Sequence, residues 1–237
     1  MRDRSRAICL RVRAVLFDLD GTLADTAADL ANAVNRVRAD RGLPPLALDA
    51  LRPHASHGAR GMLGAAFGVT REDPDFEPLR DAFLAYYEGA LCVQSRLFSE
   101  AQDVLAEIEA RGLSWGIVTN KAARFTMPLL ESLVMSERGG IVICGDTTRR
   151  AKPHPEPLLA AAKALGVEPA ECVYVGDAER DIVAGQAAGM KTLVAMYGYL
   201  GEDDAPEGWS ADGCIASLHK LLDWLPMRQP RAAKQDE

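Results

Sequence analysis

The 237-residue sequence predicts an α/β protein, in which helices cover both faces of a parallel sheet and a small α-helical insert interrupts the core. Three observations lead to this fold class. Short apolar segments alternate with helical patterns, which is typical of β-α-β units. The apolar segments are nearly continuous and rich in β-branched residues, as in strands buried on both faces. One long interval, residues 24–92, contains helical patterns and no core strand.

The predicted core is formed by residues 1–23 and 93–237. Its strands are the five short apolar segments AVLFDL (14–19), SWGIVT (114–119), GIVICG (140–145), CVYVGD (172–177) and KTLVAM (191–196). Helical patterns separate them at about residues 101–111, 122–134, 155–165 and 178–188. This order predicts a sheet in which successive strands run in parallel.

The insert, residues 24–92, is expected to form a helical domain of its own. Two segments in it, 26–42 and 74–91, show the periodicity of amphipathic helices. The turn sequence GLPP at 42–45 ends the first of them. The insert would therefore lie between the first strand and the rest of the sheet.

Charge and cysteine content exclude several classes of function. A net charge of -7 argues against general binding to nucleic acid or to an anionic membrane. Five scattered cysteines without a CxxC pair indicate free thiols in a reducing compartment. The arginine-rich N-terminus lacks a small-residue cleavage site, and no segment is apolar for long enough to span a bilayer. We therefore expect a cytoplasmic protein, monomeric or homodimeric, that acts on a small molecule.

Two aspartates, Asp18 and Asp20, follow the first predicted strand, although a carboxylate is costly to bury without a partner. Later strands and loops carry further polar groups, namely Thr119, Asn120, Lys152, Asp177 and Asp181. Because ligands of open parallel sheets bind beyond the carboxyl ends of the strands, these groups should meet in one crevice. Several carboxylates there would repel one another unless a hard divalent cation lay between them. Mg²⁺ suits such oxygen ligands together with a substrate phosphate.

The chemistry of phosphate esters suggests a role for each group at the first strand. Asp18 can attack phosphorus and form an aspartyl-phosphate. Asp20 lies two residues on and points the same way in an extended backbone. It can protonate the leaving oxygen and later deprotonate a water molecule. Gly21 permits a tight turn that directs backbone N–H groups towards a phosphate.

The groups after the later strands complete this hypothesis. Thr119 can donate a hydrogen bond to a phosphoryl oxygen, and Asn120 next to it is expected to contact the substrate. Lys152 can offset charge on the phosphoryl group and on the nucleophile. Asp177 completes a metal site, and Asp181 would bind a metal-bound water or orient a neighbouring residue.

Four segments resemble the signature motifs of the haloacid dehalogenase-like hydrolase superfamily: FDLDGTLADT, VTNK, AKPHPEP and YVGDAERDIVAGQAAGM. The resemblance covers about residues 12–225. It implies a Rossmann-like core with a mobile helical cap of the C1 type, formed here by the insert. The second aspartate of the DxD pair, which dehalogenases of the family lack, points to phosphoryl chemistry.

The resemblance also implies roles for particular residues. Asp18 would be the nucleophile and Asp20 the general acid and base. Thr119 and Lys152 would bind the phosphate. Asp18, Asp177 and the backbone carbonyl of Asp20 would ligate Mg²⁺.

Two resemblances within the superfamily suggest different substrates. The segments DGTLADTAADLANAVN and AGQAAGMKTLVAMYGY look like phosphoglycolate phosphatases, and phosphoglycolate is the working substrate expected here. The segments SHGARGMLGAAFG (56–68) and YGYLGEDDAPEGWSAD (197–212) resemble bacterial N-acetylmuramic acid 6-phosphate phosphatases. That amino-sugar phosphate is the alternative substrate.

The sequence leaves open the role of three cap residues and the type of reaction. His57, Gly58 and Arg60 would either contact the substrate or form a glycine-rich bend between two cap helices. A phosphomutase would use the same aspartyl-phosphate but return the phosphoryl group to its substrate. A non-catalytic binding protein would usually have lost one of the three carboxylates Asp18, Asp20 and Asp177, all of which are present.

Overall fold

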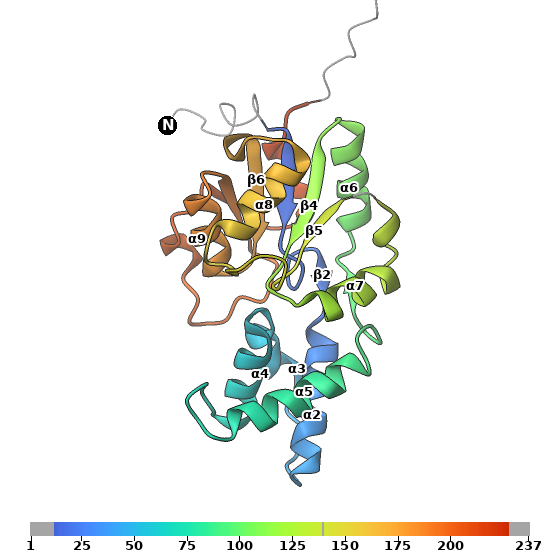
Figure 1. Cartoon of the computed structure of the whole chain (residues 1–237), viewed down its shortest axis with the longest axis vertical. Coiled ribbons are helices and arrows are strands. Elements are labelled where there is room, and N and C mark those ends of the chain that lie inside the picture. Colours follow the sequence, from blue (N-terminus) through green and yellow to red (C-terminus); the bar gives the residue numbers. More distant parts are fainter. Residues whose placement is uncertain (1–11, 139, 228–237) are drawn as a thin grey trace, which may run out of the picture.

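The computed structural model describes residues 12–138 and 140–227 (Figure 1). Its core is a six-stranded parallel sheet in the order β5-β4-β1-β6-β7-β8. The strands are β1 (Ala14–Phe17), β4 (Ser114–Val118), β5 (Ile141–Ile143), β6 (Cys172–Gly176), β7 (Lys191–Ala195) and β8 (Gly213–Ile215). The α/β fold class and the five predicted strands are confirmed. Strand β8, which has only three residues, was not predicted from the sequence.

The topology places β1 at the centre of the sheet. The chain runs from β1 to β4 and β5 on one side, and then crosses to β6, β7 and β8 on the other. A change of direction of this kind opens a crevice at the carboxyl ends of the central strands. All four residues of β1 are buried, which explains why its sequence is continuously apolar.

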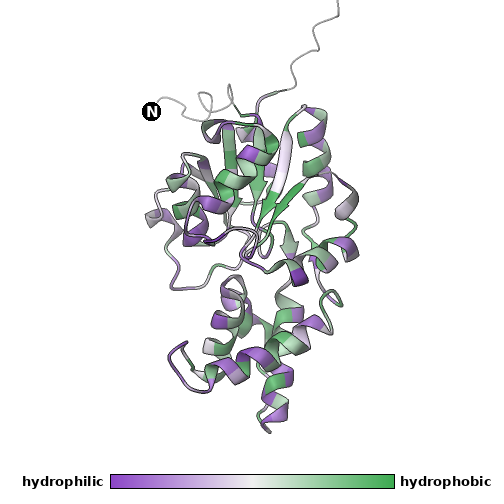
Figure 2. Ribbon diagram, in the orientation of Figure 1, coloured by the Kyte–Doolittle hydropathy of each residue, from purple (hydrophilic) through white to green (hydrophobic). Residues whose placement is uncertain are grey.

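Helices cover both faces of the sheet. On one face the apolar core contains residues of α6 (Ala101–Ala110), α7 (Ala123–Ser132) and the 3₁₀ helix η5 (Leu218–Trp224). On the other face α8 (Glu156–Leu165) and α9 (Glu179–Ala187) pack against the sheet. The four predicted core helices are present with slightly shorter bounds. Figure 2 shows apolar strands inside the core and mixed polar and apolar helices around them. The remaining short 3₁₀ helices are η2 (Ser136–Arg138), η3 (Pro169–Glu171) and η4 (Pro206–Gly208).

A helical cap lies beyond the carboxyl ends of the strands, in the lower half of Figure 1. It contains α2 (Ala27–Asp40), α3 (Leu48–Leu51), the 3₁₀ helix η1 (Arg52–His57), α4 (Gly58–Phe67) and α5 (Phe76–Glu88). Helices α2 and α5 match the two predicted ones. These helices enclose an apolar cluster that is separate from the clusters on the two faces of the sheet.

The glycine-rich segment after residue 57 is a helix, α4, and not a bend. Its buried face, formed by Met62, Leu63 and Ala66, outweighs the low helix propensity of its glycines. A Cβ on Gly61 would lie only 2.4 Å from the backbone oxygen of His54, so the close packing of α4 against η1 requires glycine there.

Two short strands connect the cap to the core. They are β2 (Ala24–Asp25), on the way into the cap, and β3 (Arg96–Leu97), on the way out. They pair in an antiparallel manner, with Ala24 opposite Leu97. The two connections therefore lie side by side, which was not predicted from the sequence.

Some expectations from the sequence concern residues outside the described part of the chain. Four cysteines, Cys92, Cys144, Cys172 and Cys214, are free thiols in the structure, whereas Cys9 lies outside the described residues. The same holds for residues 1–11, on which the expectation of no signal peptide depends. In the described ranges, no helix is both long enough and apolar enough to cross a membrane.

Candidate active site

A cavity of about 900 Å³ lies between the carboxyl ends of the strands and the cap. Its core side is lined by residues that follow β1, β4 and β6, and by the loop after β5. The sequence-predicted groups in it are Asp18, Asp20, Thr119, Asn120, Lys152 and Asp177, together with His57, Gly58 and Arg60 of the cap. The structure therefore brings together nearly all the residues that were selected from the sequence.

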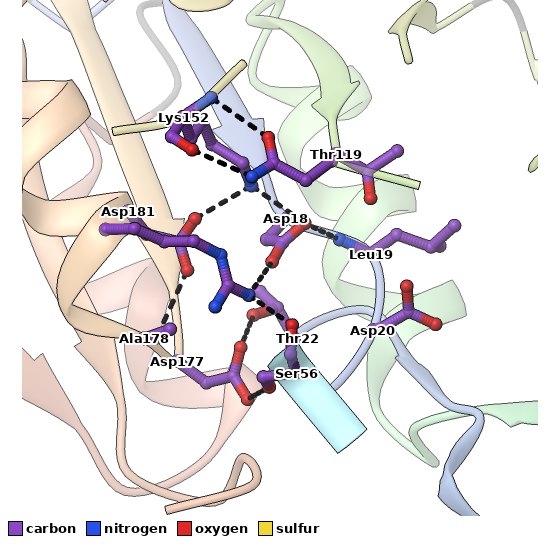
Figure 3. Close-up of polar contacts among 12 residues, drawn as sticks. Asp18, Leu19, Asp20, Thr22, Ser56, Thr119, Lys152, Asp177, Ala178 and Asp181 are labelled. Carbon is purple, nitrogen blue, oxygen red and sulfur yellow. Dashed lines mark hydrogen bonds and ion pairs between the residues drawn. The ribbon is translucent and has the colours of Figure 1, made fainter. Parts of the chain in front are cut away.

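Asp18 is the first residue after β1 and is only 2% exposed. Its N–H donates to the carbonyl of Val175 (2.9 Å), which extends the pairing of β1 with β6. Its Oδ1 accepts a hydrogen bond from the Leu19 N–H (2.8 Å) and lies 2.9 Å from Lys152 Nζ. Burial raises the pKa of Asp18, although Lys152 lowers it. The structure thus holds Oδ1 of this carboxylate between Leu19 and Lys152 (Figure 3), whereas Oδ2 lies 3.9 Å from Arg180 Nη2.

Lys152 is held between two carboxylates beneath the site. Its side chain is fully buried, and Nζ lies 2.9 Å from Asp18 Oδ1 and 2.7 Å from Asp181 Oδ1. It also lies within hydrogen-bond distance of the Val118 carbonyl (2.8 Å) and the Tyr174 hydroxyl (2.7 Å). This arrangement fixes the ammonium group beside Asp18.

Asp181 orients these partners. Its Oδ1 contacts Lys152, and its Oδ2 accepts a hydrogen bond from the Ala178 N–H (3.1 Å) at the start of α9. Burial would raise the pKa of Asp181, but Lys152 and Arg180 lower it overall. Of the two roles that the sequence suggested, the structure supports orientation of a neighbouring residue.

Asp177 follows β6 and accepts hydrogen bonds from three sides. Thr22 Oγ1 donates to Oδ1 (3.3 Å), while Ser56 Oγ (2.6 Å) and the Tyr199 N–H (2.9 Å) donate to Oδ2. Burial, reinforced by Asp18 and then by Asp181, raises its pKa to about 7. Unlike those two carboxylates, Asp177 forms no ion pair with any of the described residues.

This acidic cluster fits a divalent cation. Carboxylate oxygens of Asp18, Asp177 and Asp181 all lie within 4.8 Å of one another. The available donors are oxygens, which Mg²⁺ prefers. Burial, and then the neighbouring carboxylates Asp18 and Asp181, disfavour the charged form of Asp177 and raise its pKa, and a cation beside it would offset these effects. The residues present therefore fit a divalent metal ion, as the sequence led us to expect.

Asp20 is held in place by a hydroxyl group and an ammonium group. Thr26 Oγ1 donates a short hydrogen bond to Asp20 Oδ1, and Lys121 Nζ lies 3.1 Å from the same oxygen. Lys121 also lies 3.1 Å from the hydroxyl of Tyr87 on cap helix α5. Thr26, Lys121 and Tyr87 were not predicted from the sequence. Thr26 is the last residue of the motif FDLDGTLADT and Lys121 is the last residue of VTNK, so these motifs could have indicated both residues.

Gly21 is required by both conformation and space. Its φ of +82° is in the left-handed region, and a Cβ there would lie 2.1 Å from Asp177 Oδ2. Its N–H donates to the Ala24 carbonyl (2.9 Å), so this donor closes a turn and does not face the cavity. Gly198, which was not predicted, is also needed for space, because its Cβ would lie 2.2 Å from the Cβ of Asp177.

Thr119 and Asn120 follow β4 and have different surroundings. The buried Thr119 hydroxyl accepts a hydrogen bond from the Lys121 N–H (3.1 Å), which leaves its proton available to a ligand. The Asn120 side chain donates to the Lys152 carbonyl (2.9 Å) and accepts from the Lys152 N–H (3.0 Å). Asn120 lines the cavity, but its amide holds the Lys152 loop in place.

Besides Tyr87, the cap contributes a second contact that was not predicted from the sequence, at Ser56. Ser56 donates to Asp177, and its backbone carbonyl accepts a hydrogen bond from Arg180 Nη2 (2.6 Å). Neither Ser56 nor Arg180 stands out in the sequence, because the contact between them joins segments 124 positions apart. The predicted cap residues His57 and Arg60 line the cavity nearby. Partial burial lowers the pKa of His57, and Arg180 and Arg60 lower it further.

The fold and this site define a hydrolase with an α/β core, a buried aspartate and an acidic cation site. Residues 15–195 match the family described as haloacid dehalogenase-like hydrolase. The chain belongs to the haloacid dehalogenase-like hydrolases, as its motifs led us to expect, and is a phosphomonoester hydrolase of that family.

Similar proteins carry two different names. An N-acetylmuramic acid 6-phosphate phosphatase of Pseudomonas aeruginosa is 44% identical over 216 residues, which are 91% of this chain and 96% of that protein. A phosphoglycolate phosphatase of Xanthomonas campestris pv. campestris is 44% identical over 219 residues, 92% of this chain and 98% of that protein. The crystal structure of a predicted phosphoglycolate phosphatase from Haemophilus somnus superimposes with a TM-score of 0.78 at 26% identity, covering 90% of this chain and 97% of the other.

Proposed function

We propose that the chain is a Mg²⁺-dependent phosphatase of N-acetylmuramic acid 6-phosphate that works through an aspartyl-phosphate on Asp18. The main support for this choice of substrate is the volume of the cavity, about 900 Å³. The sequence alone led us to expect phosphoglycolate first. The relatives named for the amino-sugar phosphate, 44% and 42% identical, now favour the alternative together with the size of the cavity.

The cavity is large for a two-carbon substrate. Small-molecule sites range over roughly 300–1,000 Å³ and bury most of their ligand. Phosphoglycolate would fill a small part of a space of about 900 Å³. A hexosamine phosphate with an acetamido and a lactyl group would contact both the catalytic side and the cap side of it.

The walls of the cavity also suit an amphiphilic sugar acid. Apolar side chains of the cap line the cavity, namely Leu30, Phe76, Phe83 and Leu84, and Phe125 of core helix α7 packs in the same apolar cluster. Three cavity arginines, Arg60, Arg71 and Arg124, form no ion pair with any described residue. Arg80 differs from them, because it is paired with Glu77 at 2.6 Å. A guanidinium pairs well with a carboxylate, and the lactyl group supplies one at a distance from the phosphate.

The reaction follows from the positions of the side chains. Mg²⁺, held by Asp18, Asp177 and the backbone carbonyl of Asp20, would supply positive charge to the phosphoryl oxygens. Asp18 Oδ2 attacks phosphorus while Lys152 and Thr119 bind the phosphoryl group.

Proton transfer is assigned to Asp20. Asp20 protonates the departing sugar oxygen and later takes a proton from the water that hydrolyses the aspartyl-phosphate. Thr26 and Lys121 hold its carboxyl group in place for both steps. The cap excludes bulk water during the first step.

The test compares kcat/KM for the two phosphates on the purified enzyme, with free phosphate as the measured product. We expect a preference of about 100-fold or more for N-acetylmuramic acid 6-phosphate, equivalent to about 2.7 kcal/mol of transition-state binding. Equal values, or a preference for phosphoglycolate, would overturn the proposed substrate. Return of the phosphoryl group to a second position of the sugar, without release of phosphate, would indicate a phosphomutase instead.

Variants of the cavity arginines locate the carboxylate contact. Arg60→Ala, and separately Arg124→Ala, should lower kcat/KM for the amino-sugar phosphate and leave that for an aryl phosphate nearly unchanged, because the aryl ester has no carboxylate. Lys163→Ala on the exposed side of α8 is the control for loss of a positive charge. Equal losses of kcat/KM for both esters would show that these arginines do not determine the substrate specificity.

A further inference from the structure

Arg180 is a partly buried cation that the proposed mechanism does not use. It lies in the first turn of α9, and its side chain is 17% exposed. Its Nη2 atom lies 3.9 Å from Asp18 Oδ2, the oxygen assigned to attack. Burial lowers the pKa of Arg180, but Asp181, Asp18 and Asp177 raise it overall. The guanidinium therefore faces the same carboxylates as the predicted cation.

Ser56 of the cap connects Arg180 to Asp177. Its carbonyl accepts a hydrogen bond from Arg180 Nη2, and its hydroxyl donates to Asp177 Oδ2, both at 2.6 Å. The contacts run from Asp18 through Arg180 and Ser56 to Asp177, and Figure 3 labels Asp18, Ser56 and Asp177. We call the two hydrogen bonds of Ser56, one from Arg180 and one to Asp177, the Arg180–Ser56 bridge. It also joins the cap directly to the carboxylate of Asp177.

A divalent ion and the contacts of Arg180 and Ser56 would use the same two carboxylates, Asp18 and Asp177. Mg²⁺ takes its oxygen ligands at about 2.0–2.1 Å and demands near-octahedral geometry. An ion ligated by Asp18 and Asp177 would therefore lie close to Arg180, a like charge in a buried setting where repulsion is strong. It would also take over the Asp177 carboxylate that now accepts the hydrogen bond from Ser56.

We propose that the Arg180–Ser56 bridge competes with Mg²⁺ for Asp18 and Asp177, so that metal binding releases the cap from the core at Ser56. Arg180 is then a positioning residue, which acts on the reaction through the metal site and the cap. Because linked equilibria are reciprocal, a cap fastened at Ser56 weakens metal binding by the same factor. The proposal rests on the metal site of the proposed function and is independent of the identity of the sugar.

The first experiment measures Mg²⁺ binding by calorimetry, without substrate. Arg180→Gln should tighten binding about tenfold, because a like charge is removed. Ser56→Ala removes no charge and should still tighten it about threefold, because Asp177 loses the competing hydrogen bond. Lys163→Gln on α8 is the control for loss of a positive charge and should bind Mg²⁺ as the unmodified protein does.

The second experiment follows amide hydrogen exchange over residues 52–60. Mg²⁺ alone should speed exchange in this segment of the full chain, and the increase should be smaller in Ser56→Ala, whose contact to Asp177 is already broken. Slower exchange on adding Mg²⁺, or equal Mg²⁺ affinities in Ser56→Ala and the unmodified protein, would overturn the proposal. Absence of Mg²⁺ binding in every variant would instead refute the metal site on which both proposals rest.

Discussion

At the scale of single residues, Asp18 combines a reactive position with an environment that opposes its ionisation. Burial raises its pKa, and Lys152 at 2.9 Å partly offsets this effect. A neutral isostere should therefore be tolerated by the fold but not by the reaction. The amide oxygen of asparagine is a weak nucleophile and does not carry the charge that a cation needs.

We predict that Asp18→Asn loses several orders of magnitude in kcat and keeps a Tm at or above that of the unmodified protein. Steady-state assay of phosphate release and thermal unfolding check the two parts. Asp103→Asn, an exposed substitution in the first turn of α6, should leave both unchanged. Turnover by Asp18→Asn close to the normal rate would contradict the covalent mechanism.

A second prediction separates backbone strain at Gly21 from its contact with Asp177. Gly21 and Gly42 have φ values of +82° and +68°, but only at Gly21 would a Cβ meet Asp177. Alanine at Gly42 should lower the free energy of unfolding by about 1 kcal/mol through the left-handed backbone, and alanine at Gly21 by more, because its Cβ would also clash with Asp177. Gly21→Ala should in addition weaken Mg²⁺ binding about tenfold, because it displaces a ligand. Equal Mg²⁺ affinities in the two variants would show that Gly21 serves the turn alone.

The sequence predicted the residues that we assign to the reaction better than the residues that position them through hydrogen bonds and ion pairs. Asp18, Thr119 and Lys152 were predictable because each follows a strand, and parallel strands end at one edge. Arg180 and Ser56 were not, because their contact depends on how the cap is seated on the core. Asn120 shows the opposite case: its place in the cavity was predicted, but its hydrogen bonds to the Lys152 backbone were not.

At the scale of elements, the long periodic segments were predictable and the short ones were not. Helices α2 and α5 have 14 and 13 residues and clear amphipathic patterns. Strands β2 and β3 have two residues each and exist only because the two cap connections meet. The helix α4 was obscured by its glycines, whose low propensity is overridden by burial against the other cap helices.

The start of α2 carries a further anchor between the cap connections. Asp29 is buried and accepts hydrogen bonds from the N–H groups of Val93 (3.0 Å), Gln94 (3.0 Å) and Ser95 (2.8 Å). The Ser95 hydroxyl also donates to it at 2.7 Å. One side chain thus fastens the first helix of the cap to the segment that leaves the cap.

Asp29→Asn should lower the free energy of unfolding by about 2 kcal/mol, because an amide replaces a charged acceptor of several N–H groups. Urea denaturation measures this change. Asp73→Asn is the matched control, since Asp73 also accepts a backbone N–H, that of Thr70, but at an exposed position. A loss in Asp29→Asn no larger than that in the control would show that the anchor contributes little.

At the scale of the whole molecule, the buried carboxylates connect global stability with pH and metal. The pKa of Asp177 is about 7 in the folded protein, against 3.8 for a free aspartate. The folded state therefore keeps this proton to a higher pH than the unfolded state does. Stability that comes from the protonated form is lost as pH rises through about 7.

This linkage predicts that Mg²⁺ raises the Tm more at pH 8 than at pH 6. At the lower pH a proton competes with the ion for Asp177, and at the higher pH the ion relieves repulsion among ionised carboxylates. Thermal unfolding with saturating MgCl₂ and with a chelator, at both pH values, provides the measurement. Asp177→Asn should lose most of the difference. An equal rise in Tm at the two pH values would contradict the assignment of Asp177 as a ligand.

The pairing of β2 with β3 has a consequence for the evolution of the molecule. Because Ala24 lies opposite Leu97, the chain leaves and re-enters the core at nearly one point. A segment whose ends meet can be lengthened, shortened or exchanged while the distance that the core must span stays the same. The six-stranded core can therefore stay the same while different caps are inserted at this position. Specificity for a new substrate can then arise when the cap is replaced, while the chemistry proposed at Asp18 is kept.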